Sequence, residues 1–387
     1  MSRTPSSRPA AAGVVACLAF VLIGWSGLLV PSLIRSVRDA FDQSDAGIGL
    51  FYLIYATLYA SGSFLGGLAT ERLGRRTVLV GGALLHGAGI VLLGVAPTWV
   101  VFMIAALPMG LGAGILDGGN NGLILDLYVR GRGRALNLLH LFFSVGALTA
   151  PVTIGLLVEG GIGWQLIVIG TGLFAFPLAA LYGFVAMPGG RRDRETARAS
   201  QAGRIALQGP LILLGLAIGL YVASEVGVSS WLVRFLEPAP LTTATAALSL
   251  YWAGLAAGRL VSSALADRFD HRRFATACAV AMSVALAGAI AAPWLPVSIA
   301  LFGLAGVASG PIYPMIIAIG GDRYPDRSAA VSGFLGGTAV VGSIVYPPVM
   351  GLMSVTVGLT VAMAGNVVLG LACAVALVVV GRVRRPD

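Results

Sequence analysis

The polar stretch GGRRDRETARASQAG, residues 189–203, separates two groups of apolar segments in a chain of 387 residues. It is the only long polar segment in the interior of the sequence. A run of Gly, Arg, Ser and acids between apolar segments is typical of a linker. We therefore predict an N-terminal bundle over residues 1–188, a cytoplasmic linker over 189–208 and a C-terminal bundle over 209–387.

Each side of this linker carries six segments that are long enough to cross a bilayer, since a transmembrane helix needs about 20 mostly apolar residues. The composition agrees, because 57% of the residues are hydrophobic and 11% are charged, against roughly 25% charged in soluble domains. The sequence therefore predicts an all-α integral membrane protein with twelve transmembrane helices. The predicted spans lie near 12–34, 45–69, 77–96, 98–125, 135–158, 163–186, 209–236, 242–266, 273–292, 295–320, 328–354 and 358–381.

The first span follows Arg3 and Arg8, as a signal peptide would. Its apolar run is long and lacks a small-residue cleavage pattern before Pro31, so we interpret it as a retained span.

The basic residues, all 25 of which are Arg, predict the orientation. If the N-terminus is inside, 21 lie at cytoplasmic ends of spans, three (Arg35, Arg38 and Arg234) lie on the opposite side, and Arg259 lies within a span. The positive-inside rule then predicts cytoplasmic termini in a plasma (inner) membrane. The net charge of +9 does not indicate nucleic acid, because the Arg residues form short clusters between apolar segments.

The two halves also repeat one another at a constant offset of 196 residues. Two six-span halves repeated in parallel match the design of major facilitator transporters. The pairs that carry this register best are Tyr55 and Tyr251, Arg72 and Arg268, Arg76 and Arg272, Asp126 and Asp322, Tyr128 and Tyr324, and Pro151 and Pro347.

The loop GLATERLGRR (67–76) resembles the major facilitator loop signature, and SALADRFDHRR (263–273) is its counterpart in the second half. The resemblance implies that these loops pair with neighbouring helix ends and rearrange during transport. An ordinary positive-inside loop is the alternative. The residues proposed for this conformational role are Glu71, Arg72, Arg75, Arg76, Asp267 and Arg268.

A narrower resemblance rests on four segments: GLGAGILDGGNNGLIL (110–125), RALNLLHLFFSVGALTAP (134–151), ASEVGVSSWLVRF (223–235) and YWAGLAAGRL (251–260). Together they resemble the fucose-proton symporter group, which includes the sodium-dependent glucose transporter-like proteins. The resemblance implies a sugar or polyol carrier driven by a proton or sodium gradient. It transfers onto Asp117, Asn121, Asn137, His140, Glu225 and Trp231.

One departure from that group leaves the coupling ion open. The fucose symporter carries a functional acid in its first span, whereas AFVLIGWSGLLVPSLI (19–34) contains none.

Asp117, Asn120 and Asn121 occupy positions i, i+3 and i+4 of the fourth predicted span and should share one helical face. An ionised Asp at mid-helix costs about 2.5–3.5 kcal/mol, so such residues usually face a cavity or a partner. Asp117 could bind substrate hydroxyls, accept the coupling ion, or make a structural hydrogen bond. Gly110 and Gly114, four residues apart on the same span, permit close approach of another backbone.

The repeat separates the two acids of this span. Asp126 recurs as Asp322 and is interpreted as scaffold, whereas Asp117 aligns with Tyr313 and occurs in one half only. That asymmetry favours a site role for Asp117. His140 on the fifth span lies at a similar depth, so a contact between the two is possible.

Glu225 lies near the middle of the seventh span, and Trp231 follows it toward the outside. A carboxylate for hydroxyls and an indole for an apolar sugar face would make a second wall of the site. Trp231 could instead be an interfacial anchor. Glu225 is, with Asp117, a candidate coupling residue.

Other residues are weaker candidates. Trp25 on the first span and Tyr55 on the second could line a cavity, although an aromatic stripe is more often packing. We expect His86 to make a structural hydrogen bond. Arg259 could snorkel or pair with an acid, and we expect a packing role for it rather than substrate binding. Pro311, together with Pro314, should kink the tenth span.

The sequence contains no nucleophile with a base, no metal-ligand set and no phosphate-binding loop, so we expect neither an enzyme nor an ATP-driven pump, and no cofactor. The expected partners are a small-molecule substrate and the lipid bilayer, with the protein as a monomer. The main alternative to a sugar carrier is an exporter of drug-like or lipid-like amphiphiles driven by proton antiport.

Overall fold

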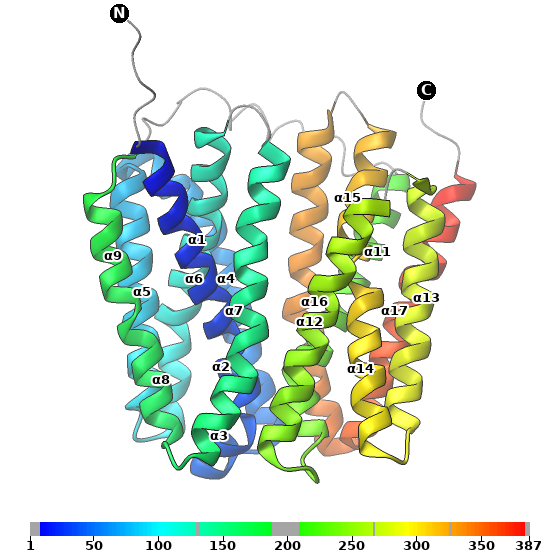
Figure 1. Ribbon diagram of the computed structural model, residues 1–387, viewed down its shortest axis with the longest axis horizontal. Helices are drawn as coiled ribbons and strands as arrows, with labels where there is room; N and C mark the ends of the chain where they lie inside the picture. Colours follow the sequence, from blue (N-terminus) through cyan, green and yellow to red (C-terminus); the bar gives the residue numbers. More distant parts are fainter. Residues whose placement is uncertain (1–7, 129–131, 188–208, 266–267, 325–326, 384–387) are drawn as a thin grey trace, which may run out of the picture. The chain divides into compact units, whose positions relative to one another are not determined.

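The computed structural model describes residues 8–128, 132–187, 209–265, 268–324 and 327–383, and every regular element in these ranges is a helix (Figure 1). Long apolar segments form helices because backbone polar groups must bond within the segment when no water surrounds them. The predicted linker, residues 189–208, lies outside the described residues, as does Asp267.

The contacts within the chain define two compact units. The first comprises Met1–Asp42 and Phe51–Arg192, and the second comprises Gln43–Leu50 and Asp193–Asp387. The short segment Gln43–Leu50 therefore groups with the second unit, although it lies in the first half of the sequence.

The first unit is built from nine helical segments, of which α4 begins in the segment that groups with the second unit. Within it α5 packs against α6, α8 and α9, and α1 packs against α7. The segments are α1 (Arg8–Gly27), α2 (Leu29–Ser32), α3 (Ile34–Ala40), α4 (Asp45–Leu73), α5 (Arg75–Gly94), α6 (Trp99–Leu127), α7 (Arg132–Glu159), α8 (Trp164–Leu173) and α9 (Ala175–Phe184).

The second unit repeats this plan. Within it α11 packs against α16 and α17, α12 packs against α14, and α13 packs against α14 and α17. The segments are α11 (Gly209–Phe235), α12 (Leu241–Leu265), α13 (His271–Ala291), α14 (Leu295–Ser309), α15 (Ile312–Arg323), α16 (Ser328–Thr356) and α17 (Leu359–Arg382).

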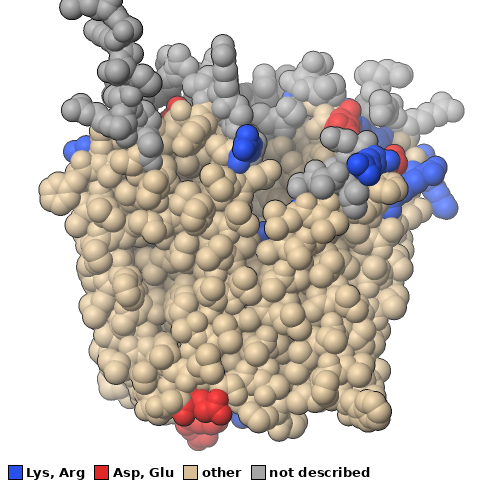
Figure 2. Space-filling model, viewed as in Figure 1, with Lys and Arg blue, Asp and Glu red and all other residues tan. Residues whose placement is uncertain are grey.

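Eleven helical stretches among the described residues are long and apolar enough to cross a membrane. They coincide with the predicted spans except the eighth, and that one forms the 25-residue helix α12. The twelve predicted spans are thus all helical. On the face shown in Figure 2, most charged side chains lie toward the helix ends, which leaves a belt with few charged side chains along the helices.

The tenth span consists of two helical segments, and the two residues between them, near the prolines for which a kink was predicted, keep right-handed helical dihedral angles. Helix α14 ends at Ser309, and α15 begins at Ile312, with Gly310 and Pro311 between them. The equivalent helix of the first unit, α6, continues through the same region without a break.

The predicted repeat recurs in side-chain pairing. Arg75 Nη1 lies 2.8 Å from Asp126 Oδ2 in the first unit, and His271 Nδ1 lies 2.9 Å from Asp322 Oδ2 in the second. Both pairs join the first turn of α5 or α13 to the end of α6 or α15, at positions 196 residues apart. The interpretation of Asp126 and Asp322 as scaffold therefore agrees with their contacts.

Candidate functional site

The site around Asp117 depends on two glycines of α6. A Cβ at Gly110 would meet the backbone carbonyl of Tyr55, and a Cβ at Gly114 would meet that of Tyr59. Since only glycine leaves this room, α4 lies directly against α6. The close approach predicted from the glycine spacing is real, and it brings two tyrosines of α4 beside Asp117.

Asp117 is half-buried, and its carboxyl has two neutral partners. The hydroxyl of Tyr59 hydrogen-bonds to it, and Asn121 Nδ2 donates to Oδ1 at 3.1 Å. Tyr55 lies close enough to interact electrostatically. No Arg side chain among the described residues forms an ion pair with Asp117. The carboxyl is therefore held by hydrogen bonds alone.

Asn120 differs from the expectation that it shares the face of Asp117. Its side chain is fully buried, its Nδ2 donates to Leu116 O at 2.7 Å, and its Oδ1 accepts from Tyr182 Oη at 2.8 Å. The 60° between positions i and i+3 is enough to turn Asn120 toward α9 and away from Asp117. Asn120 thus ties α6 to α9, and we remove it from the candidate site.

His140 and Trp25 are also placed by their own contacts. The His140 ring packs edge-on against Phe20 at a centroid distance of 5.3 Å, whereas the hydrogen bonds of Asp117 go to Tyr59 and Asn121. Trp25 is half-buried, and its Nε1 donates to Thr171 Oγ1 at 3.1 Å. Tyr55 stacks on Phe51, with centroids 6.3 Å apart.

A second buried carboxyl lies in the second unit. Glu225 on α11 is buried, and it accepts a short hydrogen bond from the hydroxyl of Tyr221, one helical turn earlier. Tyr251 on α12 interacts electrostatically with the same carboxyl and hydrogen-bonds with Ser309. The result is a polar cluster built from three helices of one unit.

Arg259 belongs to this cluster as well. It lies close enough to both Tyr221 and Tyr251 to interact with them electrostatically. Arg259 therefore has electrostatic interactions in this cluster in addition to any packing role. The two buried carboxyls differ in their surroundings, because Glu225 shares its tyrosine partners with a cation and Asp117 has hydrogen-bond donors only.

Trp231 does not have the exposed ring expected of a residue that lines a substrate site. Its side chain is fully buried, and its Nε1 donates to Pro347 O at 2.9 Å. Its ring edge also lies against Gly351, where a Cβ would be 3.1 Å from Cζ2. The indole therefore fastens α11 to α16, which also argues against an interfacial anchor.

The predicted conformational loops have contacts at helix ends. Besides the Arg75 ion pair, Arg76 Nη2 donates to Val185 O at 3.0 Å just after α9. Glu71 and Arg72 are exposed in the last turn of α4, and Arg268 is exposed before α13.

His86 makes the structural hydrogen bonds expected of it. Its ring nitrogens lie 2.9 Å from Ser26 Oγ and 2.9 Å from Met109 O. Because it is fully buried with both nitrogens engaged, His86 joins α1, α5 and α6.

Sequence reasoning missed two contributors. Tyr221 was not singled out, although its position four residues before Glu225 places it on the same face of the helix. Arg259 was undervalued, although a charge within a span is by default a functional signal. Among the described residues no group of three or more His, Cys, Asp or Glu side chains could hold a metal ion.

Two bundles of apolar helices, with a half-buried carboxyl in one and a buried carboxyl in the other, each beside hydroxyl groups, have the features of a multi-pass membrane transporter of small molecules. The sequence profile described as Major Facilitator Superfamily matches residues 14–239 and again residues 212–387. The chain therefore belongs to the Major Facilitator Superfamily, and the fold resemblance stated from the sequence is confirmed.

Several relatives align with most of the chain, and two of them are described here. Bypass of stop codon protein 6 of Saccharomyces cerevisiae is 26% identical over 395 residues, covering 89% of this chain and 78% of that protein. A glucose/galactose transporter of Brucella abortus is 23% identical over 370 residues, covering 89% and 88%.

Solved structures share the fold. A bacterial homologue of the human lysosomal transporter Spinster, in an inward-facing and occupied conformation, has a TM-score of 0.84 at 15% identity, covering 99% of this chain and 100% of that one. The fucose:proton symporter of E. coli has a TM-score of 0.65 at 18% identity, covering 96% and 99%.

Proposed function

We propose that the protein carries a small hydroxyl-rich solute, a monosaccharide, across the membrane by alternating access, coupled to a proton or sodium gradient. The observation that carries the proposal is Asp117, a half-buried carboxyl in mid-span whose partners are Tyr59 and Asn121. Relatives and neighbours whose names include glucose/galactose and fucose:proton transport support the substrate class.

Asp117 is the group we assign to the coupling ion. Asp117 is a carboxyl in mid-span that is held by hydrogen bonds, and such a group can take part in ion coupling. Tyr59 and Asn121 both donate to this carboxyl, and imposed proton and sodium gradients distinguish which ion it takes. The first predicted span contains no acid, so Asp117 is the residue of the first half that we propose to bind the coupling ion.

Glu225 is the group we assign to the substrate. Its cluster combines a carboxylate with the hydroxyls of Tyr221 and Tyr251 and the nearby guanidinium of Arg259. Such convergent donors and acceptors suit a ligand that carries several hydroxyls.

The experiment uses the full-length protein in liposomes with labelled monosaccharides. Asp117→Asn should retain exchange of labelled for unlabelled sugar and lose accumulation driven by an imposed proton gradient, whereas Glu225→Gln should lose both activities. Glu159→Gln, an exposed acid at the end of α7, serves as the control.

Full accumulation by Asp117→Asn would reject the coupling role. Sodium-driven accumulation without a proton response would replace the proton as coupling ion. A flat response to every sugar, together with transport of apolar compounds, would favour the amphiphile exporter.

We also infer that both termini face the cytoplasm and that the membrane is the plasma membrane, since Arg residues cluster at one set of span ends. A reporter fused after Asp387 that is active only in the cytoplasm should be active. An active periplasmic or extracellular reporter at that position would reverse the orientation.

A further inference from the structure

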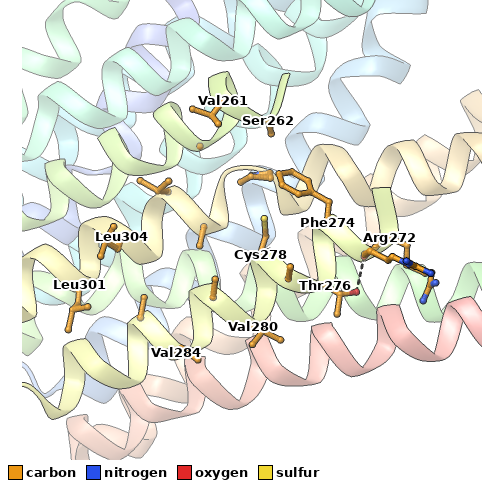
Figure 3. A pocket seen from close by; sticks show the side chains of 18 of the residues that line it. Val261, Ser262, Arg272, Phe274, Thr276, Cys278, Val280, Val284, Leu301 and Leu304 are labelled. Atoms are coloured by element: carbon orange, nitrogen blue, oxygen red, sulfur yellow. Dashed lines mark hydrogen bonds between the residues drawn. The ribbon is translucent and has the colours of Figure 1, made fainter. Parts of the chain in front are cut away.

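A groove of about 1250 Å³ lies among α12, α13 and α14 of the second unit (Figure 3). Its walls are almost wholly apolar and include Val261, Cys278, Leu301 and Leu304. Figure 3 shows Arg272 at the end of the groove away from Leu301. This groove is separate from the Glu225 cluster, and the proposed function makes no use of it.

The two units differ at several positions of their repeat that border the groove. In the first unit Ile115 fills the corresponding space, since a Cβ at Gly66 would lie 3.1 Å from Ile115 Cα and a Cβ at Gly82 2.6 Å from Ile115 Cγ2. The residue 196 positions later is Pro311, which lies between α14 and α15. Pro311 lines the groove, where its short ring stands in place of the Ile115 side chain.

Two further differences enlarge the groove. Leu85 and Leu92 of α5 correspond to Ala281 and Gly288 of α13, and both of the smaller residues line the groove. A Cβ at Gly288 would lie 3.2 Å from Leu301 Cδ1, so a side chain at position 288 would enter the groove.

The charge at the end of the groove also differs between the units. Arg272 has a counterpart in Arg76, and both contact equivalent positions at the next helix end, Gly381 and Val185. Arg273 has no such counterpart, because the first unit has Thr77 there. The exposed side chain of Arg273 lines the groove. Compared with the first unit, the second unit therefore has smaller apolar side chains and one more cation at this place.

We propose that this groove binds one phospholipid with an anionic headgroup, its phosphate at Arg273 and an acyl chain along α13. The lining runs from Arg273 to Gly288, which is about 22 Å of helix. One leaflet of hydrocarbon is about 15 Å deep, so the groove is long enough for an acyl chain. The groove lies among membrane-spanning helices, so lipid molecules surround it. The positive charge of Arg273 favours an anionic headgroup over a neutral one.

The test is native mass spectrometry of the full-length protein with added phosphatidylglycerol or phosphatidylcholine of identical acyl chains. The wild-type protein should retain one phosphatidylglycerol in preference to phosphatidylcholine. Arg273→Thr, which installs the residue of the first unit, should reduce that preference about fivefold, the effect of one Arg near an anionic surface. Arg382→Thr removes an exposed Arg at the end of α17 that does not line the groove, and it should leave the preference unchanged.

A second pair of variants tests the apolar part. Ala281→Leu with Gly288→Leu, again the residues of the first unit, should reduce retention of both lipids. Ala287→Leu adds the same side chain at an exposed position of α13 outside the lining and should change nothing. The charge-state distribution in the same spectra reports whether each variant remains folded.

Three outcomes would overturn the proposal. Equal retention of the two lipids by the wild type would mean ordinary surrounding lipid. An unchanged headgroup preference in Arg273→Thr would place selectivity elsewhere. A dimer that the Ala281→Leu and Gly288→Leu variant abolishes would make the groove an interface between two copies of the chain.

Discussion

The hydroxyl of Tyr59 on α4 hydrogen-bonds to the carboxyl of Asp117 on α6, although 58 positions of sequence separate the two residues. The contact exists because α4 and α6 touch through their backbones. This hydrogen bond links the proposed coupling residue to a second helix. A change in the charge of Asp117 would therefore change its interaction with α4.

We predict that Tyr59→Phe lowers gradient-driven uptake about fivefold, since a hydrogen bond of this kind contributes about 1 kcal/mol. Uptake by liposomes under an imposed gradient measures the effect. Tyr55→Phe keeps the stacking on Phe51 and should reduce uptake less. Equal losses in the two variants would argue against a special role for the Tyr59 hydroxyl.

Gly114→Ala should destabilise the protein by about 1–3 kcal/mol, because the new methyl group would push against the carbonyl of Tyr59 and separate α4 from α6. Thermal unfolding in detergent measures the loss. Gly67→Ala, in α4 with open space around its Cβ, is the matched control and should not destabilise. The explanation fails if the two variants unfold at the same temperature.

Asp126→Asn should lower the unfolding temperature more than Asp322→Asn does. Arg75 is 12% exposed and would lose its carboxylate partner, at a cost of about 1–3 kcal/mol. The pair of His271 and Asp322 is more exposed, with 64% of the Asp322 side chain accessible, so its loss should cost under about 1 kcal/mol. The opposite order would show that pair exposure does not govern these scaffold contacts.

Trp231→Phe should reduce stability by about 1 kcal/mol through the lost bond to Pro347 O and leave the apparent substrate affinity unchanged. Concentration dependence of uptake together with thermal unfolding separates these effects. A raised KM with unchanged stability would restore Trp231 to the substrate site.

Much of the architecture could be predicted because it follows from local patterns. The spans and the scaffold pair Asp126 and Asp322 rest on run length and a repeat register. The glycine spacing at Gly110 and Gly114 also predicted a close helix contact. Each of these signals is read from the order of residues along the chain, so none of them needs knowledge of which helices are neighbours in space.

The side-chain partners could not be predicted in the same way. Asn120 and Asn121 are adjacent in sequence, yet one bonds to Tyr182 and the other to Asp117. Trp231 matched a sugar-stacking position but is closed off by α16. Helical periodicity predicts only roughly which side of a helix a side chain faces. Its contacts depend on which neighbouring helix packs against that side.

By itself the sequence determined that this chain is a bundle of twelve apolar helices in two repeated halves, since hydrocarbon forces each long apolar segment to satisfy its own backbone. Tertiary structure alone decided which polar groups share a cluster. Only the packing of α4 on α6 puts hydroxyl donors at Asp117, and only the packing of α11 with α12 adds Tyr251 and Arg259 to Glu225. Those pairings depend on distances between segments far apart in the chain, which the packing of whole helices sets.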